Sequence, residues 1–336
     1  MSELGPREQA LARSRLYGLL ARLLVRGVER PLLEQIAALG WAESDASLDE
    51  LAAEHHASFA LGVFPYAGVF LDASASAGAC SDLVRSFYAR AGFNPILDEL
   101  TADHLGVELS FLSFVTGAQA EALEDGRPQI AAALDPLLAE FLDACVLSYL
   151  PAMVCAIEQL PDAGSWATII REALLLLAEH RARLPGPIVP VALIDPGDLL
   201  ADERTGLRRI AEHLLTPAAS GVFASRADIA AWGRGRSLPR GFGARVVMLD
   251  NLLRSAVEYG ELASLLAALD AHLEARDHAL AGLARACELE PAVAPWREAL
   301  ARTRTLLARL ASKVHSPDQA GSPWTSKPST TPPPAP

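Results

Sequence analysis

The spacing of apolar residues constrains this chain most, because it follows the period of an α-helix almost from the N-terminus. One stripe of a first helix consists of leucines, whereas Arg13, Arg15 and Arg22 lie off that stripe. The leucines are Leu11, Leu16, Leu19, Leu20, Leu23 and Leu24. Hydrophobic residues make up 51% of the chain but aromatic residues only 6%, so Ala, Leu and Val dominate the core. Ala and Leu favour helices, and strands favour aromatic and β-branched residues. The sequence therefore predicts an all-α fold.

Helical periodicity continues through most of the chain and is interrupted at a few places. The predicted helices after the first cover residues 31–39, 47–59, 79–91, 102–122, 128–160, 165–183, 203–215, 226–233, 243–269, 271–287 and 295–312. The helix at 128–160 should bend near Pro151, which removes a backbone donor. Residues 60–78 are rich in Gly, Ala and Ser, and we expect them to form an ordered surface loop.

Proline clusters predict the domain organisation. Four prolines between Leu184 and Gly197 prevent a helix from running through that segment. The predicted parts are a helical domain at 1–184, a Pro-rich linker at 185–202, a C-terminal helical region at 203–312 and a disordered Pro/Ser/Thr tail at 313–336.

The net charge limits the classes of partner that the protein is expected to bind. The formal charge of -12 argues against nucleic acid, which needs a concentrated basic surface. Residues 1–15 contain charges and no apolar run, so an ordinary secretory signal is not expected. The most apolar later stretch, residues 144–157, is shorter than the roughly 20 residues that a membrane span needs. We expect a cytoplasmic protein with a surface suited to a positively charged peptide.

The four cysteines are widely scattered, and none belongs to a CxxC pair. This spacing predicts neither a zinc site nor a disulfide framework, and the apolar neighbours suggest buried thiols in a reducing compartment. The cysteines are Cys80, Cys145, Cys155 and Cys287.

The strongest candidate for a functional site is Asp103-His104, at the start of an amphipathic helix. His104 and Glu108 share one helix face at i, i+4, a spacing that suits a metal or an acid–base pair. The alternative is helix capping, in which Thr101 caps the helix and Asp103 complements the positive end of its dipole. Capping is the commoner role for such residues.

Two histidine doublets invite a comparison with metal phosphohydrolases. His55-His56 and Asp103-His104 provide ligand types, but the order of the second doublet is reversed and no further ligand converges with them. Phosphate-binding glycine loops and nucleophile elbows are also missing from the sequence. We therefore expect no metal site, no cofactor and no enzymatic activity.

A second candidate site is the arginine-rich stretch from Trp232 to Arg245. Arg234, Arg236 and Arg240 lie among glycines there, and such a loop can bind an anion. The alternative is an inter-helix turn whose arginines pair with the acidic surface.

Several segments together resemble the TorD/DmsD family of redox-enzyme maturation chaperones, a TorD/NarJ-like family. Residues 65–72 (Pro-Tyr-Ala-Gly-Val-Phe-Leu-Asp) resemble the Pro-aromatic-x-Ser-Val-aromatic-Leu loop of that family. Residues 99–109 resemble its Glu-x-Pro-x-Asp-His signature and the following helix, and residues 15–20 look like its first helix. Leu150-Pro151 stands where members commonly have an aromatic-Pro pair. Order and spacing agree over about residues 8–183.

This chain departs from the family pattern at two positions and in length. Thr101 stands where the signature usually has Pro, and Gly68 stands where the loop usually has Ser. The chain also continues for over a hundred residues past the usual end, and this second half looks similar to the extensions of some larger members.

The resemblance implies a TorD-like helical bundle that binds the twin-arginine signal peptide, the apo catalytic subunit, or both, of a molybdopterin oxidoreductase. It would hold that subunit before export, while the cofactor is inserted. The family pattern implies a client site at Asp103, His104, Glu99 and Tyr66, with Glu108 on the same helix. The protein would act as a monomer or a homodimer.

Two other readings remain open, a helical adaptor that binds another protein and a metal-dependent hydrolase. The sequence does not name the client enzyme, the oligomeric state or the role of the second half. It also leaves open whether a nucleotide or molybdenum cofactor binds.

Overall fold

The computed structural model describes residues 4–43, 46–73, 78–97, 99–202, 204–236, 238 and 242–315. Within these ranges every extended regular element is a helix, and a single antiparallel bridge joins Tyr66 to His104. The predicted all-α fold is confirmed. No helix in the same ranges is both long and apolar enough to cross a membrane.

The first half of the molecule consists of short and medium helices. These are α1 (Pro6–Arg26), α2 (Arg30–Ala38), α3 (Leu48–His55), η1 (His56–Gly62), α4 (Ala67–Leu71), α5 (Ala79–Ala91), α6 (Leu105–Glu124), α7 (Pro128–Ala132), α8 (Asp135–Phe141), η2 (Leu142–Val146), α9 (Leu150–Ile157) and α10 (Ser165–Arg183). The labels η1 and η2 denote π-helical turns. The observed α5 coincides with the predicted range 79–91, and α10 with 165–183.

Small residues let α1 and α6 pack closely along their length. A Cβ atom at Gly18 would lie 3.1 Å from the Ser113 Oγ. The Ser14 hydroxyl donates to the Ser113 carbonyl at 2.8 Å, and the Ser113 hydroxyl donates to the Ser14 carbonyl at 2.8 Å. These reciprocal bonds fix α1 against α6.

Two predictions for the first half are wrong. Residues 128–160 do not form one bent helix, because turns divide them into α7, α8, η2 and α9. Pro151 lies in the first turn of α9, where its missing N–H has no intrahelical partner to lose. The predicted loop at 60–78 contains α4, which is too short to show a helical period in the sequence.

The second half consists of α11 (Leu207–Leu214), α12 (Pro217–Ser220), α13 (Arg226–Arg234), α14 (Arg245–Glu258), α15 (Leu262–Cys287) and α16 (Glu290–His315). The predicted break between residues 269 and 271 is wrong, because α15 runs straight through it. The chain instead turns at Gly260, whose φ of 72° suits glycine. The last helix extends to His315, so residues 313–315 of the predicted tail are helical, and residues 316–336 lie outside the described residues.

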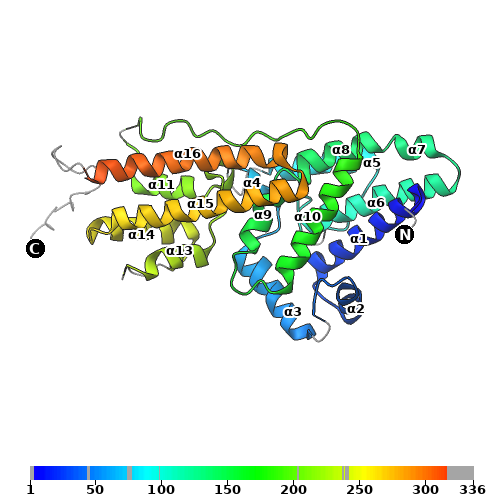
Figure 1. Ribbon diagram of the computed structural model, residues 1–336, viewed down its shortest axis with the longest axis horizontal. Helices are drawn as coiled ribbons and strands as arrows, with labels where there is room; N and C mark the ends of the chain where they lie inside the picture. Colours follow the sequence, from blue (N-terminus) through cyan, green and yellow to red (C-terminus); the bar gives the residue numbers. More distant parts are fainter. Residues whose placement is uncertain are drawn as a thin grey trace, which may run out of the picture.

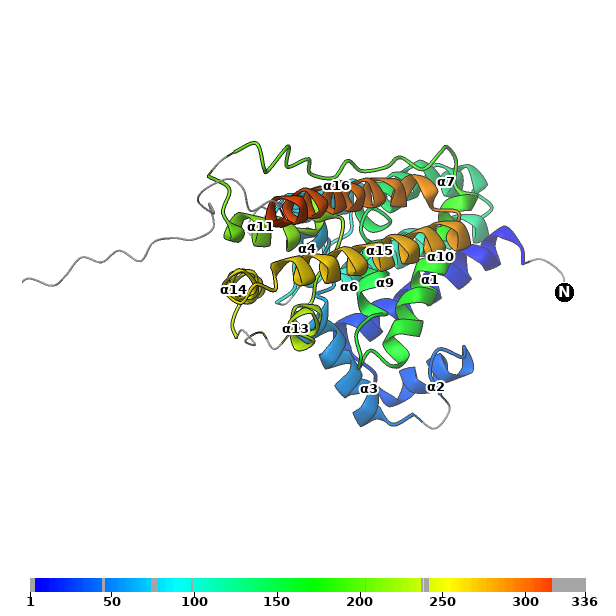
Figure 2. The same cartoon turned by 60° about the vertical axis from the view of Figure 1, so that its left-hand side comes forward.

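The molecule is elongated, with the second half at one end (Figure 1). Helices α15 and α16 form an antiparallel hairpin along its length, and α11, α13 and α14 pack beside the far end of that hairpin (Figure 2). Residues 184–202, here called the strap, run without a helix along α16 (Figure 1).

A buried ion pair holds the start of the strap. The guanidinium of Arg181 binds the carboxylate of Asp143 with two bonds of 2.6 and 3.0 Å, and both side chains are buried. Arg181 also donates to the Pro187 carbonyl, and Asp143 accepts from the Val189 amide. The predicted Pro-rich linker is therefore attached to the first half by its backbone.

One hydrophobic core runs through both halves. The indole N–H of Trp296 on α16 donates to the Ser148 carbonyl at 2.8 Å. Arg276 on α15 donates to the Cys155 carbonyl near the end of α9, at 2.7 Å. The division into folding units at 184 and 203 stays a prediction, because these contacts do not test whether either part folds alone.

Candidate functional site

The two segments that carry the family pattern bind each other directly. The Ala67 amide donates to the Asp103 carbonyl at 3.0 Å, and the Leu105 amide donates to the Pro65 carbonyl at 2.8 Å. These bonds form the bridge between Tyr66 and His104. We call residues 65–68 and 103–105 together the clasp. It joins the start of α4 to the start of α6.

The side chain of Asp103 closes the clasp. Its Oδ2 accepts the Gly68 amide at 2.9 Å, and its Oδ1 accepts the Thr101 hydroxyl at 2.6 Å. Asp103 therefore satisfies a free amide in the first turn of α4. Helix α6 begins only at Leu105, so the expectations that Thr101 caps it and that Asp103 lies in its first turn are wrong.

His104 is the residue that caps α6. Its Nδ1 accepts the Gly106 amide at 3.0 Å, which places the proton of the neutral ring on Nε2. Burial lowers the pKa of His104 to about 4, and the nearby Asp103 carboxylate opposes this shift. The ring is neutral at pH 7 and packs edge-on against Tyr66, with centroids 4.8 Å apart.

Glu108 lies in the interior and does not reach the surface. Its Oε2 accepts the Tyr149 hydroxyl at 2.8 Å, and its Oε1 has no hydrogen-bond partner among the described residues. Burial raises the pKa of Glu108 well above its usual range, and Asp103 raises it further. Burial therefore favours the protonated form of this carboxyl. It shares the predicted helix face with His104, but that face points into the core.

The exposed part of the site consists of apolar and acidic side chains around the clasp. Tyr66 is half-buried and Glu99 is exposed. Phe64 and Val25 are both more than two-fifths exposed, and Val25 lies beside the start of α6, 2.7 Å from where a Cβ of Gly106 would stand. The clasp thus has a surface that can receive an apolar chain.

A second apolar area lies two turns along α6. Phe114 on α6 is exposed, and its ring packs against that of Phe93 with centroids 5.3 Å apart. Ile96, in the loop after α5 that also contains Phe93, is almost fully exposed. Sequence reasoning missed both this area and Phe64. A signal for Phe64 was present, since aromatic residues flank Pro65 on both sides within a Gly-rich segment.

Two carboxylates converge on Gly68. A Cβ atom at this position would lie 3.0 Å from the Asp72 Oδ2 and 3.1 Å from the Asp103 Oδ2. Asp72 also accepts the thiol of Cys80 at 3.2 Å, and burial raises the pKa of that thiol above its usual range. Sequence reasoning did not predict Asp72 as a site residue. It is only partly buried and provides negative charge beside the clasp.

The metal-dependent reading gains no support from the described ranges, which hold no group of three or more His, Cys, Asp or Glu side chains arranged for a metal ion. His55 packs edge-on against the Trp166 ring with centroids 4.8 Å apart. Its Nε2 lies 3.4 Å from the Leu24 carbonyl. His55 therefore has a packing role in this structure.

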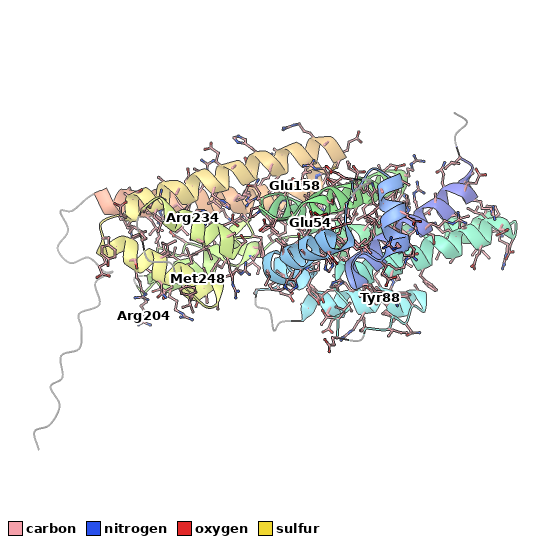
Figure 3. The ribbon with its side chains drawn as sticks, turned by 90° about the horizontal axis from the view of Figure 1, so that it is seen from below. Glu54, Tyr88, Glu158, Arg204, Arg234 and Met248 are labelled. Atoms are coloured by element: carbon pink, nitrogen blue, oxygen red, sulfur yellow. The ribbon has the colours of Figure 1, made fainter. Side chains whose placement is uncertain are left out.

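The arginine-rich loop is only partly described. Arg236 donates to the Ser264 hydroxyl and carbonyl and to the Trp232 carbonyl, so its guanidinium joins α13 to α15. Arg234, labelled in Figure 3, lies at the end of α13, and its side chain is exposed. Arg240 lies outside the described residues. The predicted anion site stays a prediction, and Arg236 has a structural task.

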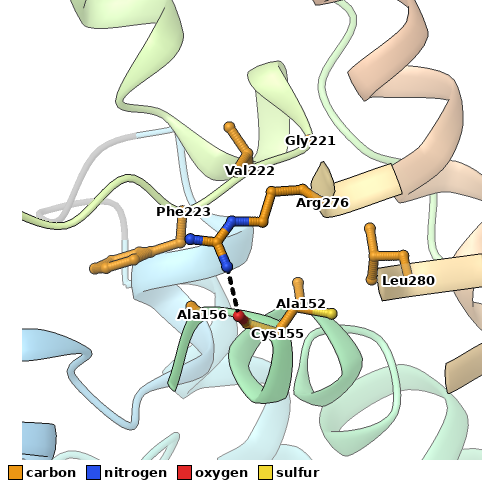
Figure 4. Close-up of a pocket in the computed structure, with 8 residues that line it drawn as sticks. All are labelled: Ala152, Cys155, Ala156, Gly221, Val222, Phe223, Arg276 and Leu280. Carbon is orange, nitrogen blue, oxygen red and sulfur yellow. Dashed lines mark hydrogen bonds between the residues drawn. The ribbon is translucent and has the colours of Figure 1, made fainter. Parts of the chain in front are cut away.

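A small pocket lies between α9, the turn after α12, and α15 (Figure 4). The guanidinium of Arg276 crosses it and reaches the Cys155 carbonyl. Cys155 is buried, and burial raises the pKa of its thiol to about 12. The pocket belongs to the junction between the halves and offers no reactive group.

Comparison with known proteins supports a family assignment for part of the chain. Residues 23–154 match the family model described as nitrate reductase delta subunit. This range contains the whole clasp, and it ends within α9. Neither the curated proteins nor the solved structures that were compared gave a match.

Proposed function

We propose that this protein is a maturation chaperone of the TorD/NarJ type, which binds the apo catalytic subunit of a molybdopterin oxidoreductase. The match of residues 23–154 to the nitrate reductase delta subunit family, a family of redox-enzyme maturation chaperones, supports this role. The observation that carries the proposal is the clasp, because the two segments with the TorD/DmsD pattern meet in space through backbone bonds. The task is binding, and no catalytic step is assigned to any residue.

The client segment that fits best is a twin-arginine signal peptide, which combines two arginines with an apolar stretch. The apolar stretch packs on Phe64, Val25 and Tyr66, whose exposed surface is lost from water on binding. Glu99 and Asp72 provide carboxylates for the arginines, since a guanidinium binds a carboxylate with two parallel bonds. The net charge of -12 favours the approach of a cationic peptide.

The predicted site residues divide into two roles in this proposal. Tyr66 and Glu99 contact the client because they reach the surface. Asp103 and His104 are almost fully buried, so they position the clasp. Glu108 supports the same helix from inside the core.

The test is calorimetry with the purified protein and the signal peptide of a molybdenum reductase encoded nearby. We expect a Kd of about 1 µM or tighter, which corresponds to roughly 8 kcal/mol of binding free energy. Phe64→Ala should weaken binding about tenfold, as truncation of a central aromatic contact does. Ile130→Ala on α7 is the matched control, because Ile130 is exposed to nearly the same extent but lies far along the chain from the clasp.

Replacing the two arginines of the peptide by glutamine tests the acidic part of the site and should also weaken binding. If the folded protein binds neither the peptide nor the apo catalytic subunit, the chaperone role is contradicted. A helical adaptor for another protein would then be the better account.

A further inference from the structure

Helix α4 connects the clasp to the second half of the chain. Its N-terminal turn is held by Asp103 through the Gly68 amide. Two residues on, the fully buried ring of Phe70 lies among three other rings. Ring centroids are 5.4 Å away at Phe223, 6.4 Å at Trp296 and 5.8 Å at Tyr149.

Two of these three rings come from the second half. Phe223 follows α12, and Trp296 belongs to α16. A five-residue helix is not stable by itself, because the first helical turn costs more free energy than its hydrogen bond returns. The position of α4 therefore depends on the clasp at its start and on these rings at its side.

Contacts from the second half hold the Phe223 ring, and a hydrogen bond to the first half holds the Trp296 ring. Gly221 has a φ of 81°, and a Cβ there would lie 2.5 Å from the Leu300 amide nitrogen, so the turn before Phe223 lies directly on α16. The guanidinium of Arg245 covers the Phe223 ring at 4.4 Å. Trp296 is bonded through its indole N–H to the Ser148 carbonyl.

We propose that Phe223 and Trp296 are positioning residues of the client site, acting through Phe70 on α4 and so on the clasp. The client in this inference rests on the proposed function, but the contact of Phe223 and Trp296 with Phe70 does not. It gives the second half a task, which is to fix the loop whose Phe64 and Tyr66 meet the client. The family match ends at residue 154, so it covers neither of these two residues.

The test compares two alanine variants within the second half. Phe223→Ala removes a ring that contacts α4. Leu253→Ala on α14 removes a buried side chain from a helix that packs on α11, α13 and α15, and serves as the matched control. Hydrogen exchange of residues 66–72 and peptide affinity are measured for both variants, under conditions where both are folded.

We expect Phe223→Ala to speed exchange at residues 66–72 and to weaken peptide binding, each about tenfold, while Leu253→Ala changes neither beyond about twofold. Phe223→Tyr, which keeps the ring, should restore both. If Phe223→Ala does not fold, Phe223→Leu and Trp296→Phe replace it in the same comparison with smaller effects.

Equal effects of Phe223→Ala and Leu253→Ala would overturn the proposal, because the link would then be general stability. Unchanged exchange at residues 66–72 in Phe223→Ala would also overturn it. Should the wild-type protein bind neither the peptide nor the apo catalytic subunit, the proposed function fails, and the exchange measurement still decides whether the second half positions the clasp.

Discussion

The two halves of the molecule place their charged and polar groups differently. The first half buries Asp103, His104 and Glu108 near the clasp and pairs Arg181 with Asp143 in its core. The second half is built around two helices of 26 residues, and the ion pairs that join them to each other, Arg297–Asp277 and Arg304–Asp270, are partly exposed. Buried polar groups require partners in fixed places, so their geometry restricts the chain more than surface pairs do.

This difference indicates that the first half carries the specialised site and that the second half supports it. Buried hydrogen bonds in the first half join segments far apart in the chain, such as Gly68 to Asp103 and Arg181 to Asp143. In the second half, surface pairs such as Arg297–Asp277 mainly strengthen the hairpin. Two buried contacts of the second half depart from this pattern. Arg276 is buried at the junction and bonded to the first half, and the buried His213 Nε2 lies 3.0 Å from the Thr303 hydroxyl.

Truncation after residue 184 should have the largest effect and would break the comparison most directly. Without the second half, Phe70 loses the rings of Phe223 and Trp296 that pack against it. The loss should exceed about 5 kcal/mol, more than removing one large buried side chain costs. We expect residues 1–184 to lack cooperative unfolding and a near-UV circular dichroism spectrum. A cooperative transition near that of the full chain would establish 1–184 as an independent domain.

Breaking the buried ion pair of the first half should have the second-largest effect. Asp143→Ala leaves the Arg181 guanidinium buried without its carboxylate and releases the strap at Val189, so it should cost about 3–5 kcal/mol. Asp270→Ala breaks the half-exposed pair with Arg304 in the second half and should cost less than about 1 kcal/mol. Chemical denaturation of both variants gives the two values.

If the two substitutions cost the same, burial of charged pairs does not distinguish the two halves. A double variant, Asp143→Ala with Arg181→Met, sharpens the result. It removes the stranded charge and should recover part of the lost stability.

Sequence alone predicted the helices whose ends are marked locally. Helix α5 ends at Gly92 in the left-handed conformation, and α10 ends before the proline cluster at 185, so both ranges were predicted correctly. Helix α4 was missed because five residues cannot display a period. The false break near 270 shows the reverse problem, since a change of pattern within α15 does not interrupt it.

The clasp was beyond prediction from local pattern, because its bonds join residues more than thirty positions apart. Resemblance to a family pointed to Asp103 and His104 but could not show that both are buried. The i, i+4 spacing correctly placed His104 and Glu108 on one face. Which face points inward depends on contacts with distant segments, such as the hydrogen bond from Tyr149, at the start of α9, to Glu108. Asp72 and Phe64 were missed for the same reason, since their importance comes from what lies beside them.

Loss of the Asp103 carboxylate should lower stability by an intermediate amount, and it tests whether the buried hydrogen bonds of the clasp restrict the first half. Asp103→Ala leaves the Gly68 amide without its acceptor and should cost about 1–2 kcal/mol. Asp103→Asn keeps an acceptor and should cost less. Thermal unfolding measures the loss, and hydrogen exchange at residues 66–72 locates it. An equal loss in both variants would mean that the charge of Asp103 matters and the hydrogen bond does not.

Acid should destabilise both halves through histidines buried in neutral form. Burial lowers the pKa of His104 to about 4 and of His180 to about 3 in the first half, and of His213 to about 4 in the second. The unfolded chain binds protons below about pH 6.5 that the folded chain refuses, so stability falls as pH falls from 6.5 towards 4. His213→Gln should reduce this fall as much as His104→Asn does, measured by denaturation at pH 4.5, 5.5 and 6.5.

The smallest effect should appear at higher pH and should belong to the first half alone. The pKa of Glu108 is raised by burial, so the folded state retains a proton that the unfolded state has already lost above about pH 4.5. Its contribution to stability is complete at low pH and declines as pH rises towards the folded pKa. Glu108→Gln keeps the acceptor for the Tyr149 hydroxyl without a titrating proton, so the decline between pH 5 and 8 should flatten. Asp270→Asn, at the surface of the second half, should leave the decline in stability between pH 5 and 8 unchanged.

A wild-type stability profile that rises over this pH range, or one that Glu108→Gln does not flatten, would mean that Glu108 is ionised and has a partner that the fold does not show. The interior of the first half would then be as tolerant of charge as the surface of the second, and the contrast between them would have to rest on Asp143 and Arg181.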